Sequence, residues 1–218
     1  MTESSPLPLR PYRFYYFGRA VAHAILRLFT RYQAEGRENV PETGGVILAP
    51  NHTSYADPPL VGCPLRRRVW FMAKAQLFDV PGMRQLVTWL GTFPVTRGAP
   101  DRRAMRVALS LLEHGEVLCI FPEGGRSPDG SLRPAERGFS FLAAKARVPI
   151  VPVGITGARD FLTPGSPLPK FAKVRVRYGR PLPPPEDPQD KAALDATGRA
   201  VMEAIACLLG VQPPEAQA

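Results

Sequence analysis

The sequence is short of cysteine and of long apolar runs, and each shortage excludes a class of protein. Its three cysteines, Cys63, Cys119 and Cys207, are widely spaced and form no CxxC pair, so neither a disulfide framework nor a structural zinc site is expected. No uninterrupted apolar stretch reaches the roughly 20 residues that a membrane-spanning helix needs. The opening MTESSPLPLRPY also lacks the apolar core of a secretory signal, which predicts a protein kept in the cytoplasm.

Histidine is scarce as well, with three residues in the whole chain. Because the carboxylates are not clustered either, the sequence offers no ligand set for a catalytic metal, and we expect none. What the chain has in excess is positive charge, a net +9 with a sequence pI of about 9.9. This charge, carried mostly by Arg, indicates an anionic partner: a phosphorylated substrate, an anionic membrane or nucleic acid. Nucleic acid is disfavoured because the basic residues are scattered and no known binding motif is present.

The pattern of apolar residues predicts one α/β domain, which suits a chain of 218 residues that is 44% hydrophobic. Strands are predicted at 46–51, 69–74, 92–97, 117–124, 150–155 and 173–179, and helices at 82–91, 101–114, 136–147 and 190–209. Their alternation predicts a mixed, mostly parallel sheet flanked by helices. Pro149 and Pro152 suggest that the strand at 150–155 lies at an edge, carries a bulge or begins there.

An amphipathic helix is predicted at 12–32, ahead of the domain proper. Its apolar stripe has a helical spacing, and Arg and His recur every four residues elsewhere on the helix. The stripe contains Phe14, Phe17, Val21, Ile25, Leu28 and Tyr32, and the basic row contains Arg19, His23, Arg27 and Arg31. Such a helix suits a membrane interface, although a helix packed on the protein's own core has the same pattern. We therefore divide the chain into an N-terminal membrane-associating segment, 1–35, and a domain, 36–218.

The first set of candidate functional residues is Asn-His-Thr-Ser-Tyr-Ala-Asp-Pro at 51–58, directly after a predicted strand. His52 can accept a proton near neutral pH, and a carboxylate such as Asp57 can fix its tautomer. Five residues apart in a regular helix, the two would lie on poorly matched faces. A working pair therefore requires a junction between a loop and a helix. The alternative is an ordinary polar loop at the surface.

Two further motifs contain candidate anion-binding residues. In FPEGGRS, at 121–127, Gly124 permits close approach of backbone amides, Arg126 can contact a phosphate in a bidentate manner, and Glu123 can orient an Arg or accept a hydroxyl. In GTFPVTR, at 91–97, Arg97 ends a short strand. Lys74 ends another strand and is a further candidate. For each of these the alternative is a solvated side chain in a turn or at a strand end.

These motifs, with VPIVPVGI at 148–155 as a fourth, resemble in order and spacing the blocks of the glycerolipid acyltransferase family. Within that family the short bacterial 1-acylglycerol-3-phosphate acyltransferases look closest. The resemblance runs from about residue 36 to residue 185. One departure is Gly125, where the family often has Thr, and this departure bears on the positioning of the substrate.

The resemblance implies transfer of a fatty acyl group from acyl-CoA or acyl carrier protein to the free hydroxyl of 1-acylglycerol-3-phosphate, giving phosphatidate. It implies His52 as general base with Asp57 orienting it, and no bound cofactor. Arg97 and Arg126 would hold the phosphate, with Glu123, Gly124 and Lys74 as further substrate-binding residues. The protein is expected to be a peripheral protein on the cytoplasmic face of the cell membrane.

Two alternatives remain at this point. A sister acyltransferase of the same fold would act on another lysolipid, and the motifs do not separate the two. A non-catalytic protein that binds the membrane surface would keep the basic amphipathic helix but would not need His52 and Asp57 together. No nucleic-acid partner is expected.

Overall fold

The computed structural model describes residues 12–96, 101–163 and 168–215. In chain order its helices and strands are α1 (Tyr12–Phe29), β1 (Gln33–Glu35), η1 (Arg37–Asn39), β2 (Val46–Pro50), α2 (Asp57–Gly62), β3 (Val69–Lys74), η2 (Ala75–Phe78), α3 (Met83–Trp89), β4 (Thr92–Val95), α4 (Arg102–Glu113), β5 (Val117–Cys119), α5 (Arg137–Ala146), β6 (Ile150–Thr156), α6 (Ala158–Phe161), β7 (Arg175–Tyr178) and α7 (Lys191–Leu209). Every predicted helix and strand is present, and β1, α6 and two short 3-10 helices, labelled η, are found in addition.

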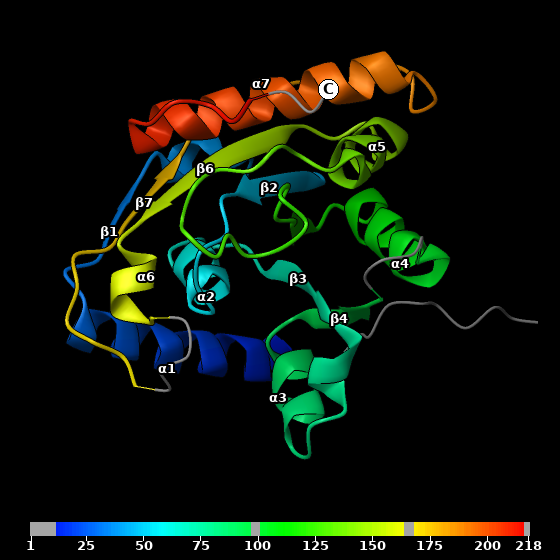
Figure 1. Cartoon of the computed structure of the whole chain (residues 1–218). Helices are drawn as coiled ribbons and strands as arrows, with labels where there is room; N and C mark the ends of the chain where they lie inside the picture. Colours follow the sequence, from blue (N-terminus) through cyan, green and yellow to red (C-terminus); the bar gives the residue numbers. More distant parts are fainter. Residues whose placement is uncertain (1–11, 97–100, 164–167, 216–218) are drawn as a thin grey trace, which may run out of the picture.

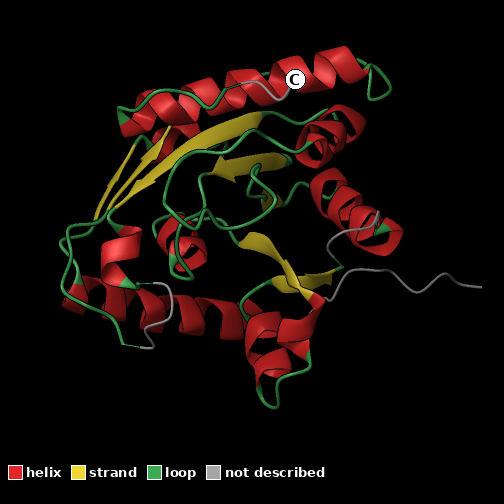
Figure 2. Cartoon of the chain, viewed as in Figure 1, coloured by secondary structure: helices red, strands yellow, loops and turns green. Residues whose placement is uncertain are grey.

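One seven-stranded sheet organises the chain, in the order β1-β7-β6-β2-β5-β3-β4. Figure 2 shows the strands in yellow, with helices in red around them. Strands β6, β2, β5, β3 and β4 run parallel to one another, whereas β7 is antiparallel to β6 and parallel to β1. The prediction of a mixed, mostly parallel sheet flanked by helices is confirmed. Because β1 pairs with β7, residues 33–35 belong to the sheet, although the predicted division placed them in the N-terminal segment.

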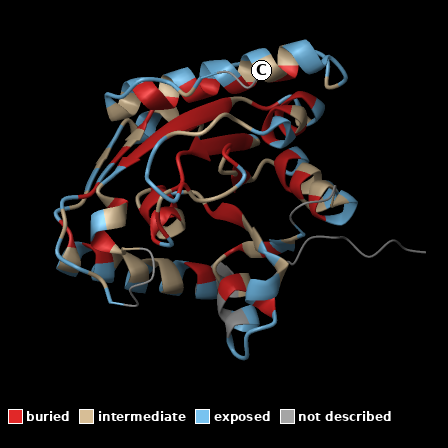
Figure 3. Ribbon diagram, viewed as in Figure 1, coloured by how far each residue is buried: buried red, intermediate tan, exposed pale blue. Residues whose placement is uncertain are grey.

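Helices cover both faces of the sheet, so the molecule has three layers (Figure 1). Residues of α1, α2 and α6 pack against one face, and residues of α4, α5 and α7 pack against the other. Along β2 the side chains alternate: Leu48 belongs to the first cluster and Ile47 to the second. The central strands are accordingly buried on both sides (Figure 3). This explains why they appear in the sequence as continuous apolar runs.

Strand β6 is an interior strand, so of the three suggested positions the edge does not apply, whereas Pro149 directly precedes the start of the strand. It lies between β2 and β7, with Pro152 in its middle. The carbonyl of Pro152 accepts from the amide of Gly179, just beyond the end of β7, and the pairing with β7 begins at Val153. Because proline has no N–H, the pairing of Pro152 with Gly179 is made through the Pro152 carbonyl alone.

Helix α1 ends at Phe29, three residues earlier than predicted. Thr30 forms a bridge with Ala172, and the amide of Arg31 donates to the carbonyl of Ala172 over 2.9 Å. The chain is thereby drawn into an extended conformation that leads into β1. Tyr32, expected to end the apolar stripe of the helix, instead donates its hydroxyl to the carbonyl of Leu60 over 2.6 Å.

The predicted apolar stripe of α1 faces outward. Phe17 is 71% exposed and Leu28 is 69% exposed, and Phe14, Val21 and Ile25 are also exposed. Tyr15 and Leu26, on another side of the helix, are buried against the domain. These five residues of the stripe therefore do not belong to the buried core. Within the described ranges, no helix has the length and apolar character that crossing a membrane requires.

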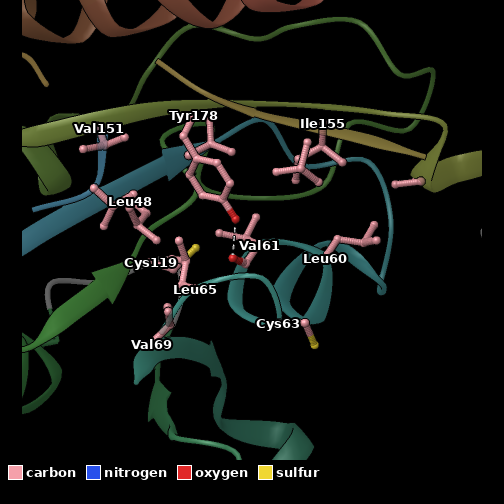
Figure 4. Close-up of a cluster of buried hydrophobic side chains, with 14 of the residues drawn as sticks. Leu48, Leu60, Val61, Cys63, Leu65, Val69, Cys119, Val151, Ile155 and Tyr178 are labelled. Carbon is pink, nitrogen blue, oxygen red and sulfur yellow. Dashed lines mark hydrogen bonds between the residues drawn. The ribbon is translucent and has the colours of Figure 1, made fainter. Parts of the chain in front are cut away.

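The cluster beneath α2 contains one buried polar contact. Tyr178 of β7 points its hydroxyl at the end of α2 and donates to the carbonyl of Val61 over 2.6 Å (Figure 4). Its ring is 2% exposed and lies among the side chains of β2, β5 and β6. Burial raises the pKa of Tyr178 well above its usual value. The hydroxyl thus remains a donor and ties the helix that begins at Asp57 to the sheet.

Replacing Tyr178 with Phe is expected to lower the free energy of unfolding by about 1–3 kcal/mol, because the carbonyl of Val61 then loses its buried donor. Urea denaturation followed by circular dichroism measures the change. Tyr55 is 65% exposed, and Tyr55→Phe serves as the control, with a change of less than about 0.5 kcal/mol. Equal effects of the two substitutions would contradict the assignment.

Candidate active site

The candidate site lies where the loops after β2 and β5 meet. The two strands are parallel neighbours, with Leu48 opposite Cys119, so both loops leave the same edge of the sheet. The carboxyl edge of a parallel sheet is the usual place for binding and catalysis in α/β proteins. The amide of Ser127 donates to the carbonyl of His52 over 2.8 Å and joins the two loops directly.

His52 and Asp57 form a buried pair. His52 Nδ1 lies 2.8 Å from Asp57 Oδ2, and the two residues are 8% and 0% exposed. His52 lies in the loop after β2, whereas Asp57 is the first residue of α2. The predicted junction between a loop and a helix is what brings them together.

A single oxygen of Asp57 organises the loop. Besides the imidazole, Asp57 Oδ2 accepts from the amide of Thr53 over 2.7 Å and from the amide of Ser54 over 2.8 Å. The Ser54 hydroxyl donates to the carbonyl of Leu162 over 3.0 Å, which fixes the loop to the end of α6. Three hydrogen bonds therefore converge on one carboxylate oxygen. The carboxyl oxygen of Asp57 accepts a hydrogen bond from Nδ1–H of His52, an arrangement that stabilises an imidazolium.

The imidazole ring of His52 is also held from the side. Phe121, in the loop after β5, stacks on it with ring centroids 3.8 Å apart and an interplanar angle of 19°. Asn51, the residue directly before His52, is anchored to β6. Its side chain donates to the carbonyl of Ile155 over 3.1 Å and accepts from the amide of Ile155 over 2.7 Å. The ring thus has one defined orientation, and three strands contribute to it.

Glu123 connects the two loops from inside. It is 5% exposed, and its Oε1 accepts from the amide of His52 over 2.8 Å. Its Oε2 accepts from the amide of Arg133 over 3.3 Å. Burial raises the pKa of Glu123, while these amides and the Arg133 charge act in the opposite direction. The carboxylate therefore holds backbone in place, and its predicted contact with substrate stays a prediction.

Arg133 is a residue that the motifs missed. Its guanidinium donates to the carbonyls of Glu123 and Gly125 over 3.1 and 2.6 Å, so it supports the turn from the other side. Gly124, within that turn, has a φ of 67°, a backbone conformation that glycine adopts without strain. Nothing in the local pattern around Arg133 signals this role, because its partners lie eight to ten residues earlier in a loop.

Arg126 and Tyr55 form a contact between the loops. The guanidinium carbon of Arg126 lies 3.6 Å from the centroid of the Tyr55 ring. Tyr55 is exposed and Arg126 is partly exposed, so the planar cation lies at the surface of the site. A guanidinium held over an aromatic face directs its N–H groups outward in its own plane, where they can bind an anionic oxygen.

The other two predicted substrate-binding residues are less closely tied to this pair of loops. Lys74 is exposed at the carboxyl end of β3, the strand next to β5 on the side away from β2. Arg97 lies outside the described residues, directly after Thr96 at the end of the β4 segment. Both remain predictions.

The buried cysteines are poor nucleophiles. Burial raises the pKa of Cys119 well above its usual value, and the nearby charge of Asp57 adds to this effect. Burial likewise raises the pKa of Cys63 to about 11. Neither thiol is a thiolate at neutral pH. In the described part of the chain, His, Cys, Asp and Glu form no group of three that suits a metal ion.

Comparison with known proteins identifies the family. A model of the acyltransferase family matches residues 31–156, which include both loops of the site. The chain belongs to the acyltransferase family. The resemblance drawn from the four motifs is thereby confirmed, and the His52–Asp57 pair lies within the matched part of this acyltransferase.

Individual relatives agree with the family match. The 1-acyl-sn-glycerol-3-phosphate acyltransferase of Bacillus subtilis is 28% identical over 169 residues, 77% of this chain and 82% of the relative. The alpha form from Homo sapiens is 31% identical over 159 residues, 70% of this chain and 55% of the relative. The chain spans about half the length of two chloroplast relatives from Brassica napus and Arabidopsis thaliana.

A solved structure has the same fold. The crystal structure of the 1-acyl-sn-glycerophosphate acyltransferase PlsC from Thermotoga maritima matches this acyltransferase with a TM-score of 0.71 and 27% identity. The match covers 91% of this chain and 78% of the other.

Replacing Glu123 with Gln should make the stability difference between variant and wild type depend on pH. Because burial raises the pKa of Glu123 above its usual 4.5, the folded state binds this proton more tightly than the unfolded state does. The stability that this adds to the wild type is fully present below pH 4.5 and is lost as the pH rises through the raised pKa.

Urea midpoints at about pH 4 and about pH 7 test this, since the advantage of the wild type over Glu123→Gln should be larger at the lower pH. Glu113 is exposed on α4, and Glu113→Gln, expected to change stability by less than about 0.5 kcal/mol at either pH, is the control. An advantage that grows with pH would contradict the burial argument.

Proposed function

We propose that the protein transfers a fatty acyl group from a thioester, acyl-CoA or acyl carrier protein, to the free hydroxyl of 1-acylglycerol-3-phosphate. The observation that carries this proposal is the buried contact of 2.8 Å between His52 Nδ1 and Asp57 Oδ2, inside the part that matches the family. The printed activity of the relatives from Bacillus subtilis and Homo sapiens supports this acceptor.

His52 acts as general base in this proposal. With Nδ1–H donated to Asp57, Nε2 is the nitrogen that takes the proton of the acceptor hydroxyl. The oxygen attacks the thioester carbonyl, and the tetrahedral intermediate collapses by expelling the thiolate. The imidazolium returns the proton to that sulfur, so the enzyme is regenerated without a covalent acyl-enzyme. Phosphatidate and the free thiol leave.

The alternative without catalysis leaves the buried carboxyl group of Asp57 unexplained. Asp57 Oδ1 is buried and has no hydrogen-bond partner among the described residues. A buried carboxylate that is satisfied at one oxygen is costly to maintain, and a protein that only binds membranes would not need it. A sister acyltransferase acting on another lysolipid would use the same pair, so the acceptor must be tested directly.

Replacing His52 with Ala is expected to lower kcat by about 10²–10⁴-fold, the usual contribution of a positioned general base. Transfer of labelled oleate from oleoyl-CoA to lysophosphatidate measures this. Asp57→Asn should also lower kcat, because its side-chain amide no longer stabilises the imidazolium. Full activity of His52→Ala would rule out this mechanism. If the wild type is active only with a different lysolipid, the proposed acceptor is wrong, and the role of His52 as general base is unaffected.

Arg126 is proposed to bind the phosphate of the lysolipid, together with Arg97. The stacking of Arg126 on Tyr55 supports this, because the ring fixes the guanidinium plane without using its N–H donors. Lys74, Glu123 and Gly124 stay proposed as further contributors to the same site. Tyr55 is then a positioning residue that acts through Arg126.

Arg126→Gln should raise KM for lysophosphatidate and lower kcat/KM by about ten- to a hundredfold, the loss expected for a hydrogen bond to a charged group. Tyr55→Leu should raise the same KM by only a few-fold, since an exposed cation–π contact contributes about 0.5–1 kcal/mol. Tyr55→Phe keeps the aromatic ring and should restore the wild-type KM. If Tyr55→Leu and Tyr55→Phe behave alike, the ring does not position Arg126.

The protein is proposed to work on the cytoplasmic face of the cell membrane as a peripheral protein. The outward stripe of α1, with Phe17 and Leu28 largely exposed, supports this, because such a surface is stabilised by insertion among lipid head groups and chains. Both substrates have long apolar chains. An enzyme held at the interface takes them up without transferring each chain into water, which costs about 0.8 kcal/mol per CH₂.

A further inference from the structure

A groove lies at the C-terminal end of α1, where α1 meets the segment before β7. Its volume is about 660 Å³, and it is lined by Arg27, Leu28, Phe29, Thr30, Arg31, Phe171, Ala172 and Lys173. The two segments are joined by backbone: the amide of Ala172 donates to the carbonyl of Phe29 over 3.2 Å, and the amide of Arg31 donates to the carbonyl of Ala172 over 2.9 Å. The walls of the groove are therefore held together.

The charged groups of the groove are all positive. Arg27, Arg31 and Lys173 are exposed, and none of them forms an ion pair with a described carboxylate. The effect reaches a neighbour: burial lowers the pKa of His23, and the charge of Arg27 lowers it further. Three cations without an acidic partner around one groove favour an anionic ligand.

The apolar groups of the groove select the kind of anion. Phe171 is 81% exposed and lies against Phe29, with ring centroids 5.5 Å apart. Leu28, also on the rim, is 69% exposed and continues the outward stripe of α1. A free phosphate makes no contact with apolar surface of this kind, whereas the acyl chains of a phospholipid lie next to its phosphate and can cover it. Cations at the level of the head groups next to apolar side chains match that arrangement.

We propose that this groove binds the phosphate head group of an anionic phospholipid, so that one end of α1 is fixed to the membrane by charge and the rest by its apolar stripe. The inference rests on the membrane attachment proposed above. It concerns a site other than the one formed by His52, Asp57 and Arg126. The lipid bound here is a fixed partner of the protein and is not consumed.

Vesicle binding by the full-length protein tests the groove. The groove variant is Arg27→Gln/Arg31→Gln/Lys173→Gln. The control variant, Arg180→Gln/Lys191→Gln/Arg199→Gln, removes two Arg and one Lys from exposed positions. Lys191 and Arg199 lie on α7, which covers the other face of the sheet (Figure 1), and Arg180 lies in the segment between β7 and α7. Co-sedimentation is measured with vesicles of pure phosphatidylcholine and of phosphatidylcholine mixed with phosphatidylglycerol.

The groove variant is expected to lose affinity for the anionic vesicles by on the order of a hundredfold, the combined effect of three cations close to an anionic surface. The control variant should lose at most a few-fold, and Arg27→Lys/Arg31→Lys should retain most of the affinity because the charge remains. Equal losses in the groove and control variants would overturn the proposal, since net charge would then explain the binding.

Two further arms separate the sources of failure. Phe17→Ser/Val21→Ser, on the stripe but outside the groove, should weaken binding to both kinds of vesicle. If the wild type binds both kinds of vesicle equally, lipid binding in the groove is overturned and the proposed membrane attachment stands. If the wild type binds neither kind, both proposals are overturned. Inorganic phosphate that displaces the protein from anionic vesicles, beyond sodium chloride of equal ionic strength, would identify a soluble phosphate as the ligand and overturn the lipid.

Discussion

The carboxylate of Asp57 is fully buried, and its Oδ2 accepts hydrogen bonds from His52 Nδ1 and from the amides of Thr53 and Ser54. These contacts require the chain after β2 to curl around one oxygen before α2 begins. The path of the loop, the tautomer of the imidazole and the start of the helix are therefore set by one interaction. The site depends on this carboxylate because the path of the loop, the tautomer of the imidazole and the start of α2 would otherwise vary independently.

A second buried carboxylate extends this arrangement to the neighbouring strand. Glu123 accepts from the amides of His52 and Arg133, and Arg133 in turn donates to two carbonyls of the turn after β5. The two loops are thus joined through backbone groups, so the side chains that reach the surface, Tyr55 and Arg126, are not needed to hold the loops together. Such preorganisation holds donors in place before the substrate arrives.

The apolar residues of helix α1 face two different environments. Tyr15 and Leu26 complete the core against the sheet, whereas Phe17 and Leu28 face outward. The Tyr15 hydroxyl accepts from the amide of Val69 over 3.0 Å and fixes the helix to β3. The outward surface thus has a fixed orientation relative to the domain. The proposed attachment to the membrane requires this fixed orientation if the candidate site is to meet substrates at a constant depth.

The sequence by itself determined the α/β class, the order of the main helices and strands, the family and the pair His52 and Asp57, because apolar periodicity and short motifs are local. The tertiary structure decided the rest. It placed β6 inside the sheet despite Pro152, turned the apolar stripe of α1 outward, and made Glu123 a link to His52, which lies 71 residues away in the chain. Arg133 had no local signal at all. Which face of a helix is covered, and which distant amide meets a carboxylate, depend on contacts between segments that only the folded chain brings together.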